Sequence, residues 1–190
     1  LVAVGGDGTL NEVASVVKGY TGIKLGVLPF GTGNDFARGI GLPEDDEGLV
    51  NVLTGGKSRL IDAGMAGDGF FINVAGFGVD VVRYTEKYKR RLNGMLPYML
   101  GILQSLIYLS RTEAEIVTDS GETFNVTVTL LSACNGTRFA GGINLAPLAD
   151  YSDGLMDICI LKKISRLRFL YLLPKYMKGK HLKYKNEFLY

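Results

Sequence analysis

The sequence predicts an α/β lobe with a parallel sheet, followed by a mainly antiparallel β lobe with inserted helices. In the first 57 residues, short apolar strands alternate with amphipathic helices, and a glycine-rich loop follows each of the first two strands. From about Lys57 onward, β-branched runs bounded by turn residues outnumber the helical patterns. We therefore expect two lobes, which span residues 1–57 and residues 58–190.

The elements of the first lobe follow from hydrophobic spacing and from glycine and proline positions. Leu10, Val13, Ala14 and Val17 repeat at the spacing of one helical face, and Thr9 before Glu12 fits a capping box. We expect the opening strand to begin before the first residue of the chain. The expected strands cover residues 1–4 and 24–30, and the expected helices cover residues 9–18, 34–40 and 45–53.

The second lobe is expected to alternate strands with three helices. Ser120-Gly121 is typical of a hairpin turn between two of its strands. The expected strands cover residues 58–63, 70–76, 115–118, 124–133 and 155–161, and the expected helices cover residues 82–91, 96–110 and 166–178. The apolar segment 95–109 is too short and too interrupted to span a membrane. It is either a helix buried between the lobes, which we favour, or one wall of a slot for acyl chains.

Composition and charge fit a folded domain and exclude several kinds of site. Hydrophobic residues make up 47% of the 190 residues and charged residues 21%. Cys134 and Cys159 lie inside apolar runs, as buried free thiols do, and His181 is the single histidine, so neither a His/Cys metal spacing nor a catalytic triad is present. The net charge is +2, yet residues 161–190 carry nine basic side chains and one acidic side chain.

Two glycine loops carry the strongest functional signal. Gly5-Gly6-Asp7-Gly8-Thr9 lies between a strand and a helix, where glycines allow close approach of a ligand and the helix N-terminus favours phosphate. Asp7 would repel a phosphate unless it contacts Mg²⁺ or a ribose hydroxyl. Gly31-Thr32-Gly33-Asn34-Asp35 repeats this arrangement after the next strand; Asp35 is either a ligand-orienting residue or a simple helix cap. Neither loop is a Walker A or a dinucleotide-binding motif.

The combination of motifs resembles the diacylglycerol, sphingosine and ceramide kinase group, and most closely the bacterial soluble diacylglycerol kinases. Gly-Gly-Asp-Gly-Thr is also similar to loops of NAD kinases and phosphofructokinases, but the second loop, continuing through Phe36-Ala37-Arg38, points to the lipid kinases. Later runs that carry the resemblance are Asp62-Ala63-Gly64, Phe71-Ile72-Asn73-Val74-Ala75-Gly76-Phe77-Gly78-Val79-Asp80, Gly141-Gly142, Ala146-Pro147 and Ser152-Asp153-Gly154-Leu155-Met156-Asp157. The resemblance implies an NAD-kinase/phosphofructokinase-like first lobe and an antiparallel β-sandwich second lobe.

The resemblance also implies an ATP site and a Mg²⁺ site. The residues that would hold the nucleotide, with Mg²⁺ at the acidic positions, are Gly5, Gly6, Asp7, Gly8, Thr9, Leu10, Asn11, Thr32, Asn34, Asp35 and Asp62. A second, structural Mg²⁺ would be held by the Asp153 carboxylate and by the carbonyl oxygens of Asp150 and Leu155. The alternative for this segment is a plain turn into the next strand.

The expected function is therefore an ATP- and Mg²⁺-dependent lipid kinase that phosphorylates diacylglycerol or a related lipid in phospholipid metabolism. No residue is assigned as general base, because the family's Asp-Gly-Glu-like stretch is expected beyond Tyr190. The alternatives are an NAD kinase-like enzyme and an inactive regulator that binds nucleotide or lipid.

The expected partners are a lipid substrate and, transiently, an anionic membrane surface, and not nucleic acid. Basic residues in segments 83–91 and 162–185, beside the apolar segment 95–109, favour such membrane contact, although a merely solvated helix face is the alternative. We expect a cytoplasmic protein, peripheral at the inner membrane face. A homodimer stays an open alternative.

Overall fold

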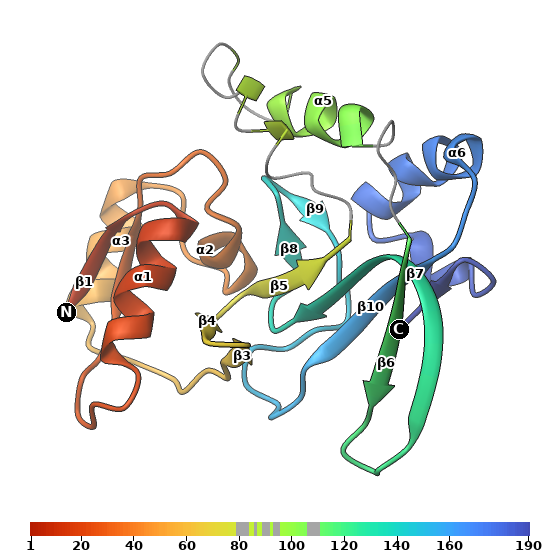
Figure 1. The fold of residues 1–190 in the computed structure, drawn as a ribbon. Coiled ribbons are helices and arrows are strands. Elements are labelled where there is room, and N and C mark those ends of the chain that lie inside the picture. The colour runs from red at the N-terminus through yellow and green to blue at the C-terminus, as the bar shows by residue number, and fades with distance from the viewer. Residues whose placement is uncertain (79–83, 86, 89–91, 93–95, 106–110) are drawn as a thin grey trace.

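The first lobe packs helices against a parallel pair of strands (Figure 1). The structure is a computed structural model that describes residues 1–78, 84–85, 87–88, 92, 96–105 and 111–190. Strand β1 (Val2–Gly5) runs parallel to β2 (Gly26–Pro29). Helix α1 (Asp7–Val17) connects the two strands, and helices α2 (Asp35–Gly39) and α3 (Asp46–Thr54) follow β2. Because the strands are parallel, the loops that follow them meet at one edge.

The second lobe is built on a five-stranded antiparallel sheet centred on a long strand, β7 (Thr123–Cys134). Strand β10 (Asp157–Lys162) pairs along one edge of β7 and strand β5 (Val74–Phe77) along the other. Strand β6 (Thr112–Val117) pairs with the first half of β7 through a turn at residues 118–122, and β11 (Phe188–Leu189) pairs with β10. The predicted α/β lobe followed by an antiparallel β lobe is confirmed.

Two helices cover the main core of the second lobe. Helix α6 (Arg166–Met177) buries Phe169, Leu172, Leu173 and Tyr176 in a cluster that also contains Ile102 of helix α5 (Leu96–Ser105). Leu96, Met99 and Leu103 of α5 are between 39% and 49% exposed, whereas Ile102 and Ser105 are buried, so only one face of the described part of the predicted buried helix is buried. None of the described helices has the length and hydropathy that a bilayer-spanning segment requires.

Several predicted boundaries are wrong for identifiable reasons. Residues 58–63 form no strand, because their backbone is held by loop contacts: the Asp62 N–H donates to the Tyr151 carbonyl at 2.6 Å. The predicted strand 70–76 is split into β4 (Gly69–Phe71) and β5, since the carbonyls of Ile72 and Asn73 accept hydrogen bonds from Asn135 instead of a strand. Helix α1 begins at Asp7, with no side-chain cap, so the predicted capping box at Thr9 is absent.

Several short elements were not predicted from the sequence. They are β3 (Gly64–Ala66), β8 (Arg138–Phe139), β9 (Ile143–Asn144) and the 3₁₀ helix η1 (His181–Lys183), together with β11. The turn between β8 and β9 has positive φ at Ala140, Gly141 and Gly142. The two glycines adopt this conformation without strain. Most of the predicted helix 82–91 and the end of the predicted helix 96–110 lie outside the described residues; Tyr84, Thr85, Lys87 and Tyr88 are helical.

The two lobes share a buried cluster. Ala3, Leu10, Ala14 and Phe36 of the first lobe pack with Ile72 and Tyr151 of the second lobe. The Phe36 and Tyr151 rings meet edge to face, with centroids 5.1 Å apart. This shared core fixes how the two glycine loops face the second lobe.

The fully buried His181 should make the protein less stable in mild acid. Its ring centroid lies 4.8 Å from those of Tyr176 and Phe188, and none of its surface is exposed. Burial lowers the pKa of His181 from 6.5 to about 4. Because the folded pKa lies below the unfolded one, this residue's stabilising contribution is complete above pH 6.5 and is lost as the pH falls towards 4. We expect a loss of about 2 kcal/mol of unfolding free energy by pH 5.

Urea unfolding at pH 7 and pH 5 tests this expectation. The parent chain should lose more unfolding free energy between the two values than His181→Phe does, whatever the starting stability of the variant. An equal loss in both chains would show that His181 does not carry the acid sensitivity.

Candidate functional site

The two glycine loops touch through their backbones. A Cβ atom on Gly31 would lie 2.3 Å from the Gly6 Cα, which leaves no room for any side chain. Asn34 folds the second loop on itself: its Oδ1 accepts from the Gly31 N–H at 2.9 Å and its Nδ2 donates to the Pro29 and Gly31 carbonyls. Asn34 itself has a φ of 52°, which asparagine tolerates. The Asn34 side chain therefore shapes the loop, whatever ligand it meets.

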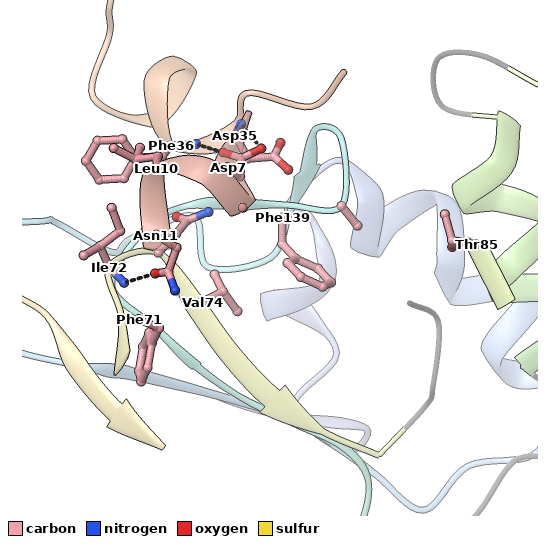
Figure 2. Close-up of a pocket in the computed structure, with 13 residues that line it drawn as sticks. Asp7, Leu10, Asn11, Asp35, Phe36, Phe71, Ile72, Val74, Thr85 and Phe139 are labelled. Carbon is pink, nitrogen blue, oxygen red and sulfur yellow. Dashed lines mark hydrogen bonds between the residues drawn. The ribbon is translucent and has the colours of Figure 1, made fainter. Parts of the chain in front are cut away.

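Asp7 ties the first loop to the second helix. Its carboxylate accepts the Asp35 N–H at 3.1 Å and the Phe36 N–H at 3.0 Å, so it caps the first turn of α2 from another helix (Figure 2). Asp35, which was one candidate for the helix cap, lies in the first turn of α2 instead. Asn34 is at the cap position, and its side chain makes no capping hydrogen bond. A negative charge at this place also complements the helix dipole. The predicted contact of Asp7 with a cation or a ribose stays a prediction.

Asp35 continues the chain of contacts into the second lobe. It is 4% exposed, and its Oδ2 accepts the Gly141 N–H of the β8–β9 turn at 2.7 Å. Its other oxygen, Oδ1, is buried and accepts no hydrogen bond among the described residues. Burial raises the pKa of the Asp35 carboxyl above its ordinary value, and the Asp7 charge adds to that rise, although the Gly141 N–H opposes it. A buried carboxylate oxygen without a hydrogen-bond donor is suited to a ligand that supplies a donor or a cation.

Asn11 makes a second bridge between the lobes. Its Nδ2 donates to the Phe70 carbonyl at 2.9 Å, and its Oδ1 accepts the Ile72 N–H at 3.2 Å. Its side chain therefore completes the backbone hydrogen bonding of the bend between β4 and β5, where no strand partner is available. The Asn11 side chain lies on α1, one turn after Asp7.

A cavity of about 280 Å³ opens beside these bridges (Figure 2). Asp7 and Asp35 lie at one end of it in the picture and Thr85 at the other. Five of the predicted nucleotide-binding residues line this cavity: Asp7, Gly8, Leu10, Asn11 and Asp35. The others, which do not line it, are Gly5, Gly6, Thr9, Thr32, Asn34 and Asp62. Of these, Thr9 in the first turn of α1 and Thr32 in the second loop are exposed.

The second lobe contributes cavity residues to which sequence reasoning gave no role. They are Phe71, Ile72, Asn73, Val74, Phe139 and Ala140, with Thr85 from the helical segment before α5 and Phe36 from α2. The run from Phe71 to Val74 is part of one of the runs that carry the family resemblance. Nothing in its pattern of polar and apolar residues indicated that the chain bends there and lines a cavity. Phe139 and Ala140 carry no motif of their own apart from the glycine pair after them.

Asp62 lies with the predicted metal loop and not with Asp7 and Asp35. Its Oδ2 accepts the Gly154 N–H at 2.7 Å. In the same loop the Asp150 Oδ1 accepts from the Ser152 N–H and hydroxyl, and the Asp153 Oδ1 accepts from the Leu155 N–H. The hydroxyl and N–H of Ser152 lower the pKa of the exposed Asp150 carboxyl. These bonds fold residues 150–155 into a tight turn with two carboxylates at its surface.

This loop fits only a cation that takes few protein ligands. Within the described residues, no three His, Cys, Asp or Glu side chains lie close enough to hold a metal ion together. Two carboxylates, carbonyl oxygens and water are the kind of donor set that Mg²⁺ accepts, whereas zinc requires more protein ligands. The predicted ligands Asp150, Asp153 and Leu155 are thus adjacent, and their metal binding stays a prediction.

Comparison with known proteins accounts for both lobes. The family model described as the diacylglycerol kinase catalytic domain matches residues 1–66, and the model described as the YegS C-terminal NAD kinase beta sandwich-like domain matches residues 73–187. The diacylglycerol kinase of Bacillus subtilis is 36% identical over 194 residues, covering 96% of this chain and 61% of that protein. The "Probable lipid kinase YegS-like" protein of Chromohalobacter salexigens is 37% identical over 174 residues, covering 88% of this chain and 55% of that protein.

Solved structures agree on the fold. The crystal structure of a diacylglycerol kinase from Bacillus anthracis superposes with a TM-score of 0.72 at 24% identity, covering 92% of this chain and 57% of that chain. Another crystal structure from the same organism gives a TM-score of 0.77 over 99% of this chain and 62% of that chain, at 22% identity. The chain thus spans about three-fifths of the length of the proteins it matches. Its two lobes, in this order and with these motifs, belong to the diacylglycerol kinase family.

Proposed function

We propose that the full-length protein transfers the γ-phosphate of ATP to the hydroxyl group of diacylglycerol or a related lipid, with Mg²⁺ required, and so feeds phospholipid metabolism. The observation that carries this proposal is the contact of two glycine loops at one edge of the β1–β2 sheet, beside a cavity lined by Asp7 and Asp35. Family membership supports the kinase class, and the names of the relatives support a lipid acceptor.

The first loop offers a phosphate site through its backbone. Gly8 lies in the first turn of α1, where N–H groups have no partner within the helix and the helix dipole is positive. A Cβ on Gly8 would meet no atom within 4 Å beyond its chain neighbours and its own helix backbone, so the space beside it is open to a ligand. The Asp7 carboxylate already accepts hydrogen bonds from two backbone N–H groups. These bonds hold it in place without help from another side chain.

Phosphoryl transfer asks a protein mainly for positioning and for neutralisation of charge. Asp7 and Asp35 are the acidic residues of the cavity and are suited to a Mg²⁺ ion that accompanies the nucleotide, since Asp35 Oδ1 lacks a donor. We assign no general base to the described residues. We propose that the base lies in the part of the protein that follows Tyr190.

Replacing Asp7 should lower the rate of transfer at least about 100-fold. Asp7→Ala removes the acceptor for two backbone N–H groups of α2 and shifts the second loop, and misplacement by about 1 Å costs about 100-fold in rate. The measurement is ATP-dependent phosphate transfer to diacylglycerol in mixed micelles with Mg²⁺, using the full-length protein. NAD as acceptor is the parallel arm, because an NAD kinase would use it.

Asp46→Ala is the matched control, because Asp46 is also the first residue of a helix but lies exposed on α3, away from the cavity. It should retain parental activity. Retained transfer in Asp7→Ala, or an equal loss in Asp46→Ala, would contradict the assignment of this cavity as the kinase site.

Two glycines should separate ligand binding from folding. Gly8→Ala adds a methyl group that meets no atom beyond its chain neighbours and its own helix backbone, so thermal stability should be unchanged or slightly raised, while affinity for an ATP analogue falls at least about tenfold because the Cβ enters the phosphate site. Gly31→Ala pushes Gly6 away and should lower both stability and affinity. Calorimetric titration and thermal unfolding give the two readouts. Parental affinity in Gly8→Ala would place the phosphates elsewhere.

Magnesium without nucleotide should stabilise the protein through the 150–155 loop. We expect the melting temperature to rise with added Mg²⁺ in the parent and to stay constant in Asp153→Ala. Asp119→Ala, a replacement in the exposed β6–β7 turn, should behave like the parent. A Mg²⁺-dependent rise that persists in Asp153→Ala would exclude Asp153 as a ligand.

A further inference from the structure

The turn between β8 and β9 holds an alanine in a conformation that alanine rarely adopts. Ala140 has a φ of 54°, and in the described part of the chain Asn34 is the other non-glycine residue with a positive φ. Asparagine offsets the cost of this conformation by hydrogen bonding to nearby backbone, as Asn34 does, whereas the methyl group of alanine cannot. Residues kept in such a conformation cluster at functional sites, so a functional role of the Ala140 methyl group is indicated.

The same turn contacts the acidic end of the cavity. The Gly141 N–H donates to Asp35 Oδ2 at 2.7 Å, and a Cβ on Gly33 of the second glycine loop would lie 3.6 Å from the Gly141 Cα. Ala140 precedes Gly141 in the chain, lines the cavity and is 8% exposed. A group bound in the cavity beside Asp35 is therefore also beside Ala140.

The cavity wall that continues from this turn is apolar. Phe71, Val74 and Phe139 line it together with Ala140. Ala140 belongs to the main core of the second lobe, and Val74 and Phe139 pack against that core, so the wall has a firm backing. In the picture the Phe139 ring lies between the acidic end of the cavity and Thr85 (Figure 2).

The polar residue of this wall, Asn73, already has partners within the protein. Its Oδ1 accepts the Tyr151 hydroxyl at 2.9 Å, and its Nδ2 donates to the Arg138 carbonyl at 3.0 Å. The second of these bonds also holds β8, and with it the turn, on the bend before β5. The wall around Phe139 and Ala140 therefore recognises a ligand by shape.

We propose that Phe139 and Ala140 select the acceptor by the branching of the carbon atom that carries its hydroxyl group. The inference rests on the proposed function, in which the glycine loops hold the nucleotide phosphates and the acceptor hydroxyl lies beside them. Reacting atoms must approach to about 3 Å, so the carbon next to the acceptor oxygen is held against the turn. A primary hydroxyl brings a CH₂ group to this place. A secondary hydroxyl brings a carbon with two carbon substituents, one of which meets the Ala140 methyl group.

The two isomers of dioctanoylglycerol test this selection with the full-length protein. The 1,2-isomer offers a primary hydroxyl and the 1,3-isomer a secondary one, at equal composition and chain length. In mixed micelles with ATP and Mg²⁺, the parent should show a kcat/KM at least about tenfold higher for the 1,2-isomer. Each product is identified as a primary or a secondary phosphate, so that acyl migration between the isomers is not counted.

Ala140→Gly should lower that preference about tenfold, chiefly by raising kcat/KM for the 1,3-isomer, because one methyl group in an apolar pocket has an effect of this size. Its melting temperature should be unchanged or raised, since glycine adopts a positive φ without strain. Phe139→Leu should change the preference in the same direction. Ala140→Ser keeps the Cβ atom and should retain the preference. Ala66→Gly removes a methyl group from the exposed β3–β4 hairpin and should behave like the parent.

The outcomes separate this inference from the proposed function. Transfer to neither isomer by the parent would overturn both. Transfer by the parent with an unchanged preference in Ala140→Gly would overturn this inference alone. An equal loss of kcat/KM for both isomers in Ala140→Gly would also overturn it, because that result would show that Ala140 only positions Gly141 on Asp35. A preference that falls as far in Ala66→Gly as in Ala140→Gly would contradict the assignment to the turn.

Discussion

The arrangement of the site depends on one carboxylate that accepts backbone N–H groups from another helix. Asp7, at the start of α1, receives the first N–H groups of α2, and Asp35 in that turn receives the Gly141 N–H of the second lobe. Three segments far apart in the sequence are thereby joined by charge-assisted hydrogen bonds, which are stronger than neutral ones. The glycine loops can touch, and the cavity can form, because this relay holds α1, α2 and the β8–β9 turn together.

The relay also explains why the cavity is shared between the lobes. Asn11 bonds the bend between β4 and β5, and Phe36 packs on Tyr151, so the first helix and the second helix each hold a different part of the second lobe. The family's two lobes thus meet through polar contacts at the loops and apolar contacts below them. A ligand between the loops would be contacted by both lobes. Binding there and the relative placement of the lobes are therefore expected to be coupled.

The sequence predicted the regular elements and the location of the loops well, because both rest on local patterns. Helix α1 shows its apolar face as a spacing of three and four, and the strands of the second lobe show β-branched runs. It did not predict the cap of α2, since Asp7 reaches Asp35 and Phe36 only through the fold. The family resemblance placed Asp62 with the nucleotide-binding residues, apart from Asp150 and Asp153. In the structure the Gly154 N–H donates to the Asp62 carboxylate and so brings Asp62 to the same loop as these two residues. The β8–β9 turn was missed because two-residue strands have no period to detect.

The central claim, that the two glycine loops hold the phosphates of a nucleotide, is tested most directly by a crystal structure of the full-length protein with a non-hydrolysable ATP analogue and Mg²⁺. The account predicts phosphate oxygens within hydrogen-bond distance of the backbone N–H groups around Gly8 and beside the loop at Gly31–Gly33, with Asp7 still bound to the N–H groups of Asp35 and Phe36. A nucleotide bound elsewhere, with the space beside Gly8 filled by water, would contradict it.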